Sequence, residues 1–210
     1  MRSSLNSERR ARSELDIPVK KRIADAASTI FAHYGVRAAT TMISELAHTN
    51  VGTVAKLFGT RERLVSDFLK SQMEDIELSW QEIEQQHPGD PEAQLRQWIS
   101  NAKMLSAEIG TPQGQLSRAA AELTGPRKDP LLSEIEAFWQ SERRKILKLC
   151  EAARFRDPPS LTDKLLLLVH GAFNERLAYG YKGPHSRLAE AGDDLMVAHG
   201  AQRKPVLEIE

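Results

Sequence analysis

The strongest chemical pattern in the sequence is a group of small polar residues at the expected start of a short helix. Asn50, Gly52 and Thr53 stand there, and Lys56 follows one turn later. The start of a helix carries unpaired N–H groups and a partial positive charge, so it attracts phosphate. Gly52 would let another backbone approach closely, and Thr53 could contact a thymine methyl group. The pattern indicates contact with nucleic acid, and the alternative is that these residues only cap the helix or carry solvated charge.

Positive charge is concentrated in the same third of the chain. Residues 1–70 contain 12 Lys or Arg and 7 Asp or Glu, a formal charge of +5, whereas residues 71–210 contain 17 and 22, a charge of −5. Such asymmetry is expected when one part of a chain meets a polyanion. A flexible arm with Arg9, Arg10 and Arg12 could add salt-dependent affinity, and a solvated tail is the alternative.

Two Glu-x-x-His spacings are the best catalytic pattern in the chain. Glu45 with His48, and Glu84 with His87, could each place two metal ligands on one face of a helix. The first pair falls in a turn region and the second runs into Pro88, whereas a di-iron site needs four long converging helices. Glycine-rich phosphate loops and nucleophile motifs are absent from the sequence. We therefore expect neither an enzyme nor a cofactor.

The composition is typical of a soluble globular protein. Of the 210 residues, 40% are hydrophobic and 28% are charged. The longest apolar run, Leu165 to Val169, is too short to span a membrane, and the N-terminus does not resemble a signal peptide. We expect a cytoplasmic protein without membrane contact. The single cysteine, Cys150, is expected to be a small buried apolar residue.

The apolar spacing predicts an all-α fold with about nine helices. Apolar residues recur every three or four positions between Gly and Pro residues, and no stretch alternates as a strand would. The predicted helices cover residues 23–34, 41–47, 50–58, 61–86, 92–109, 115–123, 130 to just before 158, 161–179 and 186–199.

Two of these helices are too short to be stable alone. Thr41 is expected to cap the first, Asn50 the second, and Thr60 the long helix that follows. Isolated helices of this length are marginal in water, so they must pack on the helix over residues 23–34. Three short helices in basic surroundings are typical of a helix-turn-helix unit.

Residues 43–64, ISELAHTNVGTVAKLFGTRERL, resemble the signature of TetR-type transcriptional regulators. The matching positions are Ile43, Ala47, Gly52, Thr53, Val54, Phe58, Thr60, Arg61, Glu62 and Leu64. The chain departs from the family pattern at His48, where Gly is common, and at Ala55 and Leu57, where an aromatic residue and His are frequent. Two side chains that often touch DNA are therefore replaced.

The resemblance implies a TetR-like fold and a double-stranded DNA operator as partner. The implied DNA-binding residues, with Arg61 at the family's phosphate-gripping position, are Thr41, Thr49, Asn50, Val51, Gly52, Thr53, Lys56, Thr60 and Arg61. The expected organisation is a flexible basic arm (1–16), a helix-turn-helix domain (17–62), a ligand-binding and dimerisation domain (63–200) and a tail (201–210). The expected function is a ligand-responsive repressor that binds a palindromic operator as a homodimer.

The middle and last helices are expected to hold an effector pocket and the dimer contact. The resemblance implies an unknown small-molecule effector among Trp98, Met104, Arg118, Glu122, Trp139, His170, Phe173 and Asn174, although packing in the core is the alternative for the aromatic residues and Met. Residues 161–179 are apolar on several sides, which favours burial against a partner subunit, or else a central position in a monomeric bundle. The expected dimer residues are Leu161, Leu165, Leu168, Ala172, Leu188 and Leu195.

Two other functions stay open at this point. A TetR-like scaffold with weakened DNA affinity could serve as a ligand-binding or interaction protein, which Ala55 and Leu57 favour. A helical-bundle metalloenzyme would need the Glu-x-x-His pairs to converge in space.

Overall fold

The structure, a computed structural model, consists of helices throughout the part of the chain that it describes. That part comprises residues 18–106, 108, 110–125, 129–179 and 183–202, without the side chains of 174–179. The helices are α2 (Val19–Tyr34), α3 (Thr40–Leu46), α4 (Val51–Phe58), α5 (Arg61–Gln86), α6 (Pro91–Ser106), α7 (Pro112–Leu123), α8 (Pro130–Ala152), α9 (Pro158–Tyr179), the 3-10 helix η2 (Pro184–Arg187) and α10 (Leu188–Ala198). The prediction of an all-α fold is confirmed.

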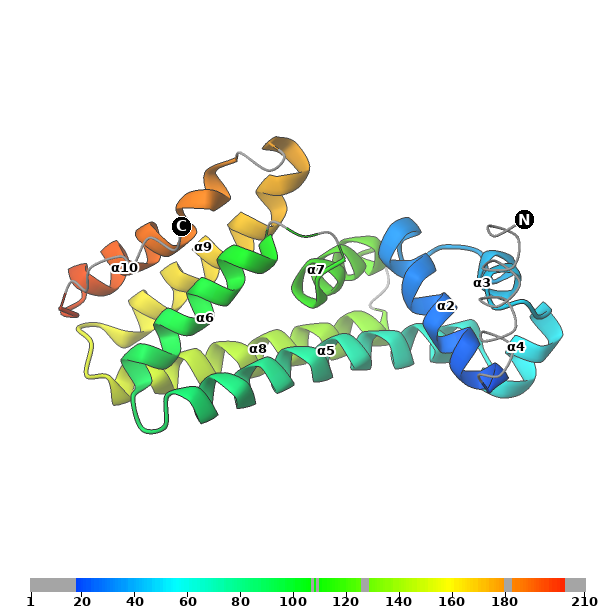
Figure 1. Cartoon of the computed structure of the whole chain (residues 1–210), viewed down its shortest axis with the longest axis horizontal. Helices are drawn as coiled ribbons and strands as arrows, with labels where there is room; N and C mark the ends of the chain where they lie inside the picture. The colour runs from blue at the N-terminus through cyan, green and yellow to red at the C-terminus, as the bar shows by residue number, and fades with distance from the viewer. Residues whose placement is uncertain (1–17, 107, 109, 126–128, 180–182, 203–210) are drawn as a thin grey trace, which may run out of the picture.

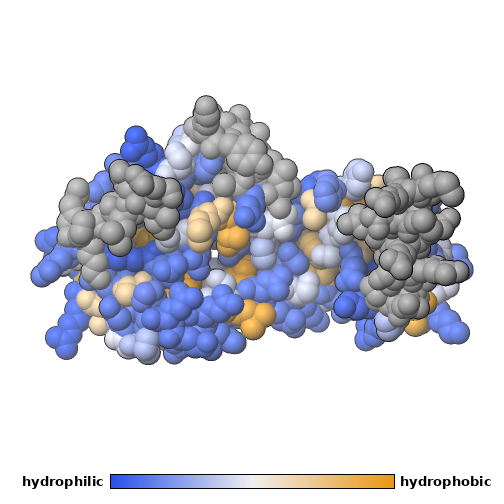
Figure 2. Space-filling view, viewed as in Figure 1, coloured by the Kyte–Doolittle hydropathy of each residue, from blue (hydrophilic) through white to orange (hydrophobic). Residues whose placement is uncertain are grey.

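The helices form an elongated molecule with a small module at one end. Figure 1 shows α2, α3 and α4 grouped at the end opposite α10, with α7 between this module and the remaining helices. The long helices α5 and α8 run side by side beneath α6, α9 and α10. On the face shown in Figure 2, hydrophilic residues cover most of the described surface and hydrophobic residues appear only in small patches. The expected boundary between residues 62 and 63 falls inside the first turn of α5, so one continuous helix joins the module to the bundle.

The module has a compact apolar core built from all three of its helices. Ile23 and Phe31 of α2, Ile43 of α3, and Val54 and Phe58 of α4 are buried. The core continues into α5, because the rings of Phe31 and Phe68 lie 5.3 Å apart. Three short helices can therefore hold a fixed arrangement that none could keep alone.

Most predicted helix ends agree with the structure, and the differences have local causes. The predicted starts at 115 and 161 lie three residues late, since Pro112 and Pro158 occupy the first helical positions. The segment predicted as 186–199 contains a 3-10 turn before α10 begins. Thr41 does not cap α3: the helix begins at Thr40 after Ala39, which makes no side-chain cap bond, and the Thr41 carbonyl accepts from Ser44 Oγ at 2.9 Å. A cap must precede the first turn, and Thr41 lies inside it.

The bundle places α9 in contact with α8 and α10, and α10 against α6. Ile99, Ile135, Ile146, Leu161 and Leu165 are fully or almost fully buried there. A Cβ atom on Gly192 would lie 2.9 Å from Ile99 Cδ1, so α10 approaches α6 more closely than a larger residue allows. Among the described residues, no helix is long and apolar enough to cross a membrane.

Candidate nucleic-acid interface

The start of α4 is exposed and capped as its sequence predicts. Asn50 Oδ1 accepts from the Thr53 backbone N–H at 2.9 Å, which confirms the predicted cap. Val51 and Gly52 are exposed, whereas Val54 and Phe58 face the core. The first turn of α4 therefore presents the backbone of Val51 and Gly52 at the surface, where an anion could approach their N–H groups.

The other expected contact residues lie around this exposed end. Lys56 is exposed one turn farther along α4, and Thr41 is exposed on α3. Thr49 is half-buried in the turn, where its backbone N–H donates to the Ser44 carbonyl at 2.9 Å. Thr60 caps α5 as predicted, since its Oγ1 accepts from the Arg63 N–H at 3.2 Å. These residues come from α3, the turn that follows it, α4 and the residue before α5.

Arg61 has intramolecular partners that the sequence does not indicate. Its Nη2 donates to the carbonyls of Val36 and Ala38, the latter at 3.2 Å, and the side chain is part-buried. The guanidinium thus ties the link between α2 and α3 to the first turn of α5. A phosphate contact by Arg61 would have to share the guanidinium with these carbonyls.

The turn between α3 and α4 contains a residue in the left-handed region. His48 has φ of +50°, although the side chain is not glycine. His is one of the residue types that tolerate this region better than most. The backbone conformation that glycine would adopt easily is thus retained here despite the departure from the family pattern.

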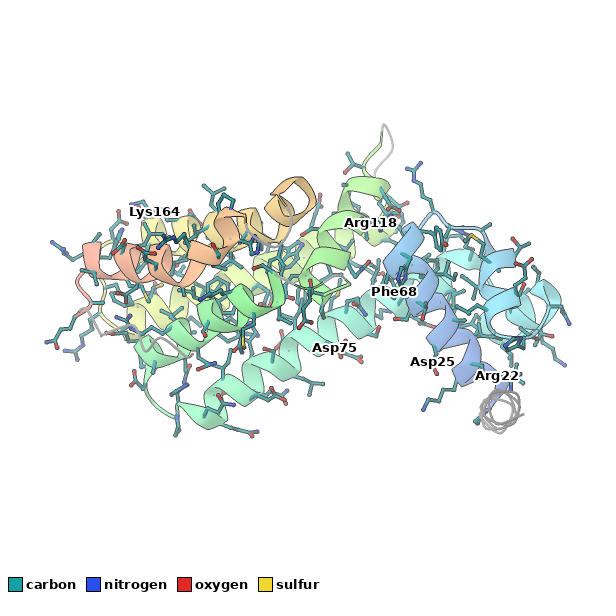
Figure 3. All side chains as sticks on the ribbon, turned by 45° about the horizontal axis from the view of Figure 1, so that its top comes forward. Arg22, Asp25, Phe68, Asp75, Arg118 and Lys164 are labelled. Atoms are coloured by element: carbon teal, nitrogen blue, oxygen red, sulfur yellow. The ribbon has the colours of Figure 1, made fainter. Side chains whose placement is uncertain are left out.

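Two residues expected in an effector pocket join α7 to the module instead. Arg118 Nη1 donates to the Ala32 and His33 carbonyls at 3.2 and 3.3 Å, and Glu122 Oε2 accepts from the Arg37 backbone N–H at 3.3 Å. We call this set of contacts the α2–α7 seam. Figure 3 shows Arg118 beside the end of α2 that faces the bundle. Its donors satisfy carbonyls that the end of a helix leaves unpaired, which explains why the two residues are here.

A small cavity lies farther along, between α5, α6, α7, α8 and α9. It has a volume of about 20 Å³, and its walls include the expected residues Trp98, Trp139, His170 and Phe173. Met104 does not line it, because the side chain is 61% exposed on the outside of α6. The side chain of Asn174 lies outside the described residues. The volume suffices for about one water molecule.

The cavity wall contains a buried carboxylate that the sequence did not single out. Glu142 is 3% exposed, and its Oε2 accepts from Trp80 Nε1 at 2.6 Å while Oε1 accepts from Lys145 Nζ at 3.2 Å. Burial raises the pKa of the Glu142 carboxyl, although both hydrogen bonds act in the opposite direction. Burial also lowers the pKa of His170, whose ring meets Trp139 edge-on at 4.8 Å.

We expect a pH-dependent stability term from Glu142. Because its pKa is raised in the folded state, its stabilising effect is present below the ordinary value of 4.5 and is lost as pH rises through the folded pKa. The free energy of unfolding of the wild type, minus that of Glu142→Gln, should therefore fall as pH increases through this window. Urea denaturation of both proteins across that range measures it, and a difference that grows with pH would contradict the expectation.

The outer face of α9 and α10 contains an apolar groove of about 560 Å³. Leu168, Ala172 and Leu195 line it as expected for a dimer contact, together with Leu167, which is 76% exposed. Leu188 lines it too, although it is almost fully buried, whereas Leu161 and Leu165 are fully buried inside the single chain and offer no surface to a partner. Four of the six expected dimer residues therefore line the groove, namely Leu168, Ala172, Leu188 and Leu195. Lys164, which Figure 3 labels, is also among the lining residues.

The Glu-x-x-His pairs do not converge. No group of three or more His, Cys, Asp or Glu side chains that could hold a metal is present within the described part of the chain. Glu45 and His48 are exposed at the turn of the module, while Glu84 and His87 lie at the far end of α5.

Several solved structures share this arrangement of helices. A TetR-family transcriptional regulator from Streptomyces coelicolor superposes with a TM-score of 0.75 at 16% identity, covering 87% of this chain and 96% of the other. A TetR-family regulator from Agrobacterium tumefaciens gives 0.73 at 18% identity, covering 87% and 98%. A TetR regulator from Haloarcula marismortui gives 0.69 at 17% identity, covering 86% and 97%.

This chain has the TetR-type fold. No protein-family model and no curated protein matches its sequence. Within this TetR-type fold, residues 43–64 form most of α3, the turn, α4 and the first residues of α5. The segment that resembles the family signature is thus the exposed helix-turn-helix of the module.

Proposed function

We propose that this protein is a DNA-binding transcriptional regulator that holds an operator duplex with the helix-turn-helix of α3 and α4. The observation that carries the proposal is the exposed, Asn50-capped start of α4 in a TetR-type fold. A helix of this kind can enter the major groove with its first residues against base edges. Solved neighbours described as TetR-family transcriptional regulators support the same class of function.

The proposal extends to a homodimer on a palindromic operator. The apolar groove of α9 and α10 supports this, because a two-fold symmetric contact uses the same patch on both subunits and an apolar patch gains free energy when it is buried. Two modules held in this way would reach two half-sites of one duplex. Selection of bound duplexes from a random pool tests this directly, because enrichment of an inverted repeat is expected, and enrichment of single half-sites would remove the dimer from the proposal.

A small-molecule effector acting on a repressor completes the proposal. The cavity between α5 and α9 is the candidate site, since Gln113 Oε1 is a buried acceptor without a hydrogen-bond partner among the described residues and the cavity has aromatic walls. Its present volume is too small for an effector, so the walls must move to admit one. Release of a bound operator by individual compounds of a metabolite library, read by fluorescence anisotropy, would identify it.

We expect Lys56→Ala to weaken operator binding and to reduce its dependence on salt. An exposed lysine that neutralises one phosphate releases about one counterion, so the slope of log affinity against log salt should flatten by about one unit. Gel-shift titrations at several salt concentrations measure the slope. Lys103→Ala, which removes an exposed lysine from α6, is the matched control and should leave the slope unchanged. An unchanged slope for Lys56→Ala would remove the assignment.

An interaction protein with weakened DNA affinity is the second candidate. Leu46 and Leu57 are exposed on the module, and the Arg61 guanidinium is engaged with its own chain. Exposed apolar side chains beside the recognition helix suit a protein surface as well as DNA. Failure of the random pool to yield any enriched duplex would favour this candidate.

A further inference from the structure

We infer that α4 reads its operator mainly through the 5-methyl groups of thymines, with Val51 and Ala55 as the reading side chains. The inference rests on the proposed DNA-binding function and states what kind of base sequence that function requires. It follows from the side chains at the start of α4, because the polar ones hydrogen-bond to each other and the apolar ones are exposed.

The polar side chains at this end of α4 are committed to each other. Asn50 Oδ1 accepts both the Thr53 N–H at 2.9 Å and the Thr53 hydroxyl at 3.3 Å. Thr53 is also half-buried, so its hydroxyl is directed back toward the cap. Using either group on a base edge would break the cap of a helix with only eight residues. The Asn50 amide nitrogen remains available, at the helix end, for a phosphate oxygen.

The side chains left at the surface are mostly apolar. Val51 is 43% exposed, and Ala55 is exposed one turn later on the same side of the helix. Gly52, between them, has no side chain, and Lys56 is exposed on a neighbouring side of the helix, where its ammonium group could meet a phosphate. The side of α4 that carries Val51 and Ala55 thus lacks a side chain that pairs with a specific donor or acceptor.

The chemistry of the major groove then selects the base. The thymine methyl is the only apolar group there, whereas guanine, adenine and cytosine present acceptors and donors. Packing Val51 or Ala55 against those polar edges would leave buried polar groups unpaired, which is costly. Packing them against a thymine methyl buries apolar surface on both sides. Discrimination therefore favours A·T pairs wherever these two residues meet the groove.

The experiment removes only the methyl group. Duplexes selected from a random pool should carry thymines at fixed positions of each half-site, and each is then replaced by deoxyuridine, which lacks the 5-methyl group. Where α4 contacts that methyl, affinity should fall by about fourfold, the factor expected for one buried methyl-sized group. Thymines outside the half-sites serve as controls and should tolerate the replacement.

Variants of Val51 test the same methyl contact from the protein side. Val51→Ala should bring the thymine-to-uracil affinity ratio toward one at the position it contacts, while Val51→Ile should keep or raise it. Leu57→Ala, an exposed position on another side of α4, should leave the ratio as in the wild type. A thermal melt of each variant establishes that it is folded.

The possible outcomes distinguish a failure of the thymine-methyl inference from a failure of the proposed DNA-binding function. Specific binding with equal affinity for thymine and uracil at every half-site position overturns the inference and leaves the DNA-binding function standing. The inference is also overturned if folded Val51→Ala and Ala55→Gly both keep the thymine-to-uracil affinity ratio of the wild type. If no duplex is enriched at all, the proposed function fails and the inference falls with it.

Discussion

Replacing Leu168 by glutamate should convert the protein to monomers and lower its affinity for a two-half-site operator by at least about a hundredfold. Leu168 is part-exposed in the apolar groove of α9 and α10, where a second copy is expected to pack. Two-fold symmetry would bring two new carboxylates into one contact, and burying an unpaired charge is strongly unfavourable. Monomers would lose the gain in affinity that two linked half-site contacts provide.

Sedimentation velocity gives the oligomeric state, and fluorescence anisotropy on full and half operators gives the affinities. Leu78→Glu is the matched control, since Leu78 is an exposed leucine on α5, outside the residues that line the groove. That variant should behave as the wild type in both measurements. A stable dimer of Leu168→Glu would place the contact between subunits on another surface.

Replacing Gly35 by alanine should lower the free energy of unfolding by about 2 kcal/mol or more. Gly35 has φ of +84° and ψ of 168°, a region that is almost restricted to glycine. An added Cβ atom would also overlap the Glu122 carboxylate, inside the α2–α7 seam. Backbone strain and displacement of the Glu122 carboxylate therefore add to each other.

Urea denaturation of a small set of variants separates the two contributions. In a Glu122→Ala background the carboxylate is gone, so Gly35→Ala should then cost only the backbone strain. Gly125→Ala is the control, because a Cβ atom there would meet no atom of the described residues within 4 Å. Equal losses from Gly35→Ala with and without the Glu122 side chain would show that the seam tolerates the methyl group.

The local parts of this structure could be predicted because short-range rules determine them. Thr60 and the Pro88-Gly89 pair delimit the long helix, and α5 indeed spans Arg61–Gln86. Asn50 was recognisable as a cap because a cap bonds within its own turn. Periodicity also separated apolar from polar faces, so the class of fold and the position of the helix-turn-helix could be deduced.

The parts that could not be predicted depend on contacts between distant segments. Arg61 reaches carbonyls 25 and 23 residues earlier in the chain, and Arg118 reaches carbonyls more than 80 residues away. Apolar spacing indicated that Leu161 and Leu165 are buried but could not show that their own chain covers them. Periodicity identifies a face without identifying its partner.

Helix α7 has the dimensions of a lever. Gln113, beside the cavity, and Glu122, in the α2–α7 seam, are nine residues apart, which corresponds to about 13 Å along the helix axis. Pivoting this short rod by about 10° at the cavity would move its other end by about 2 Å, more than a hydrogen bond of ordinary length can absorb. The movement of a single side chain in the cavity wall would thus be amplified into a displacement at the C-terminal end of α2.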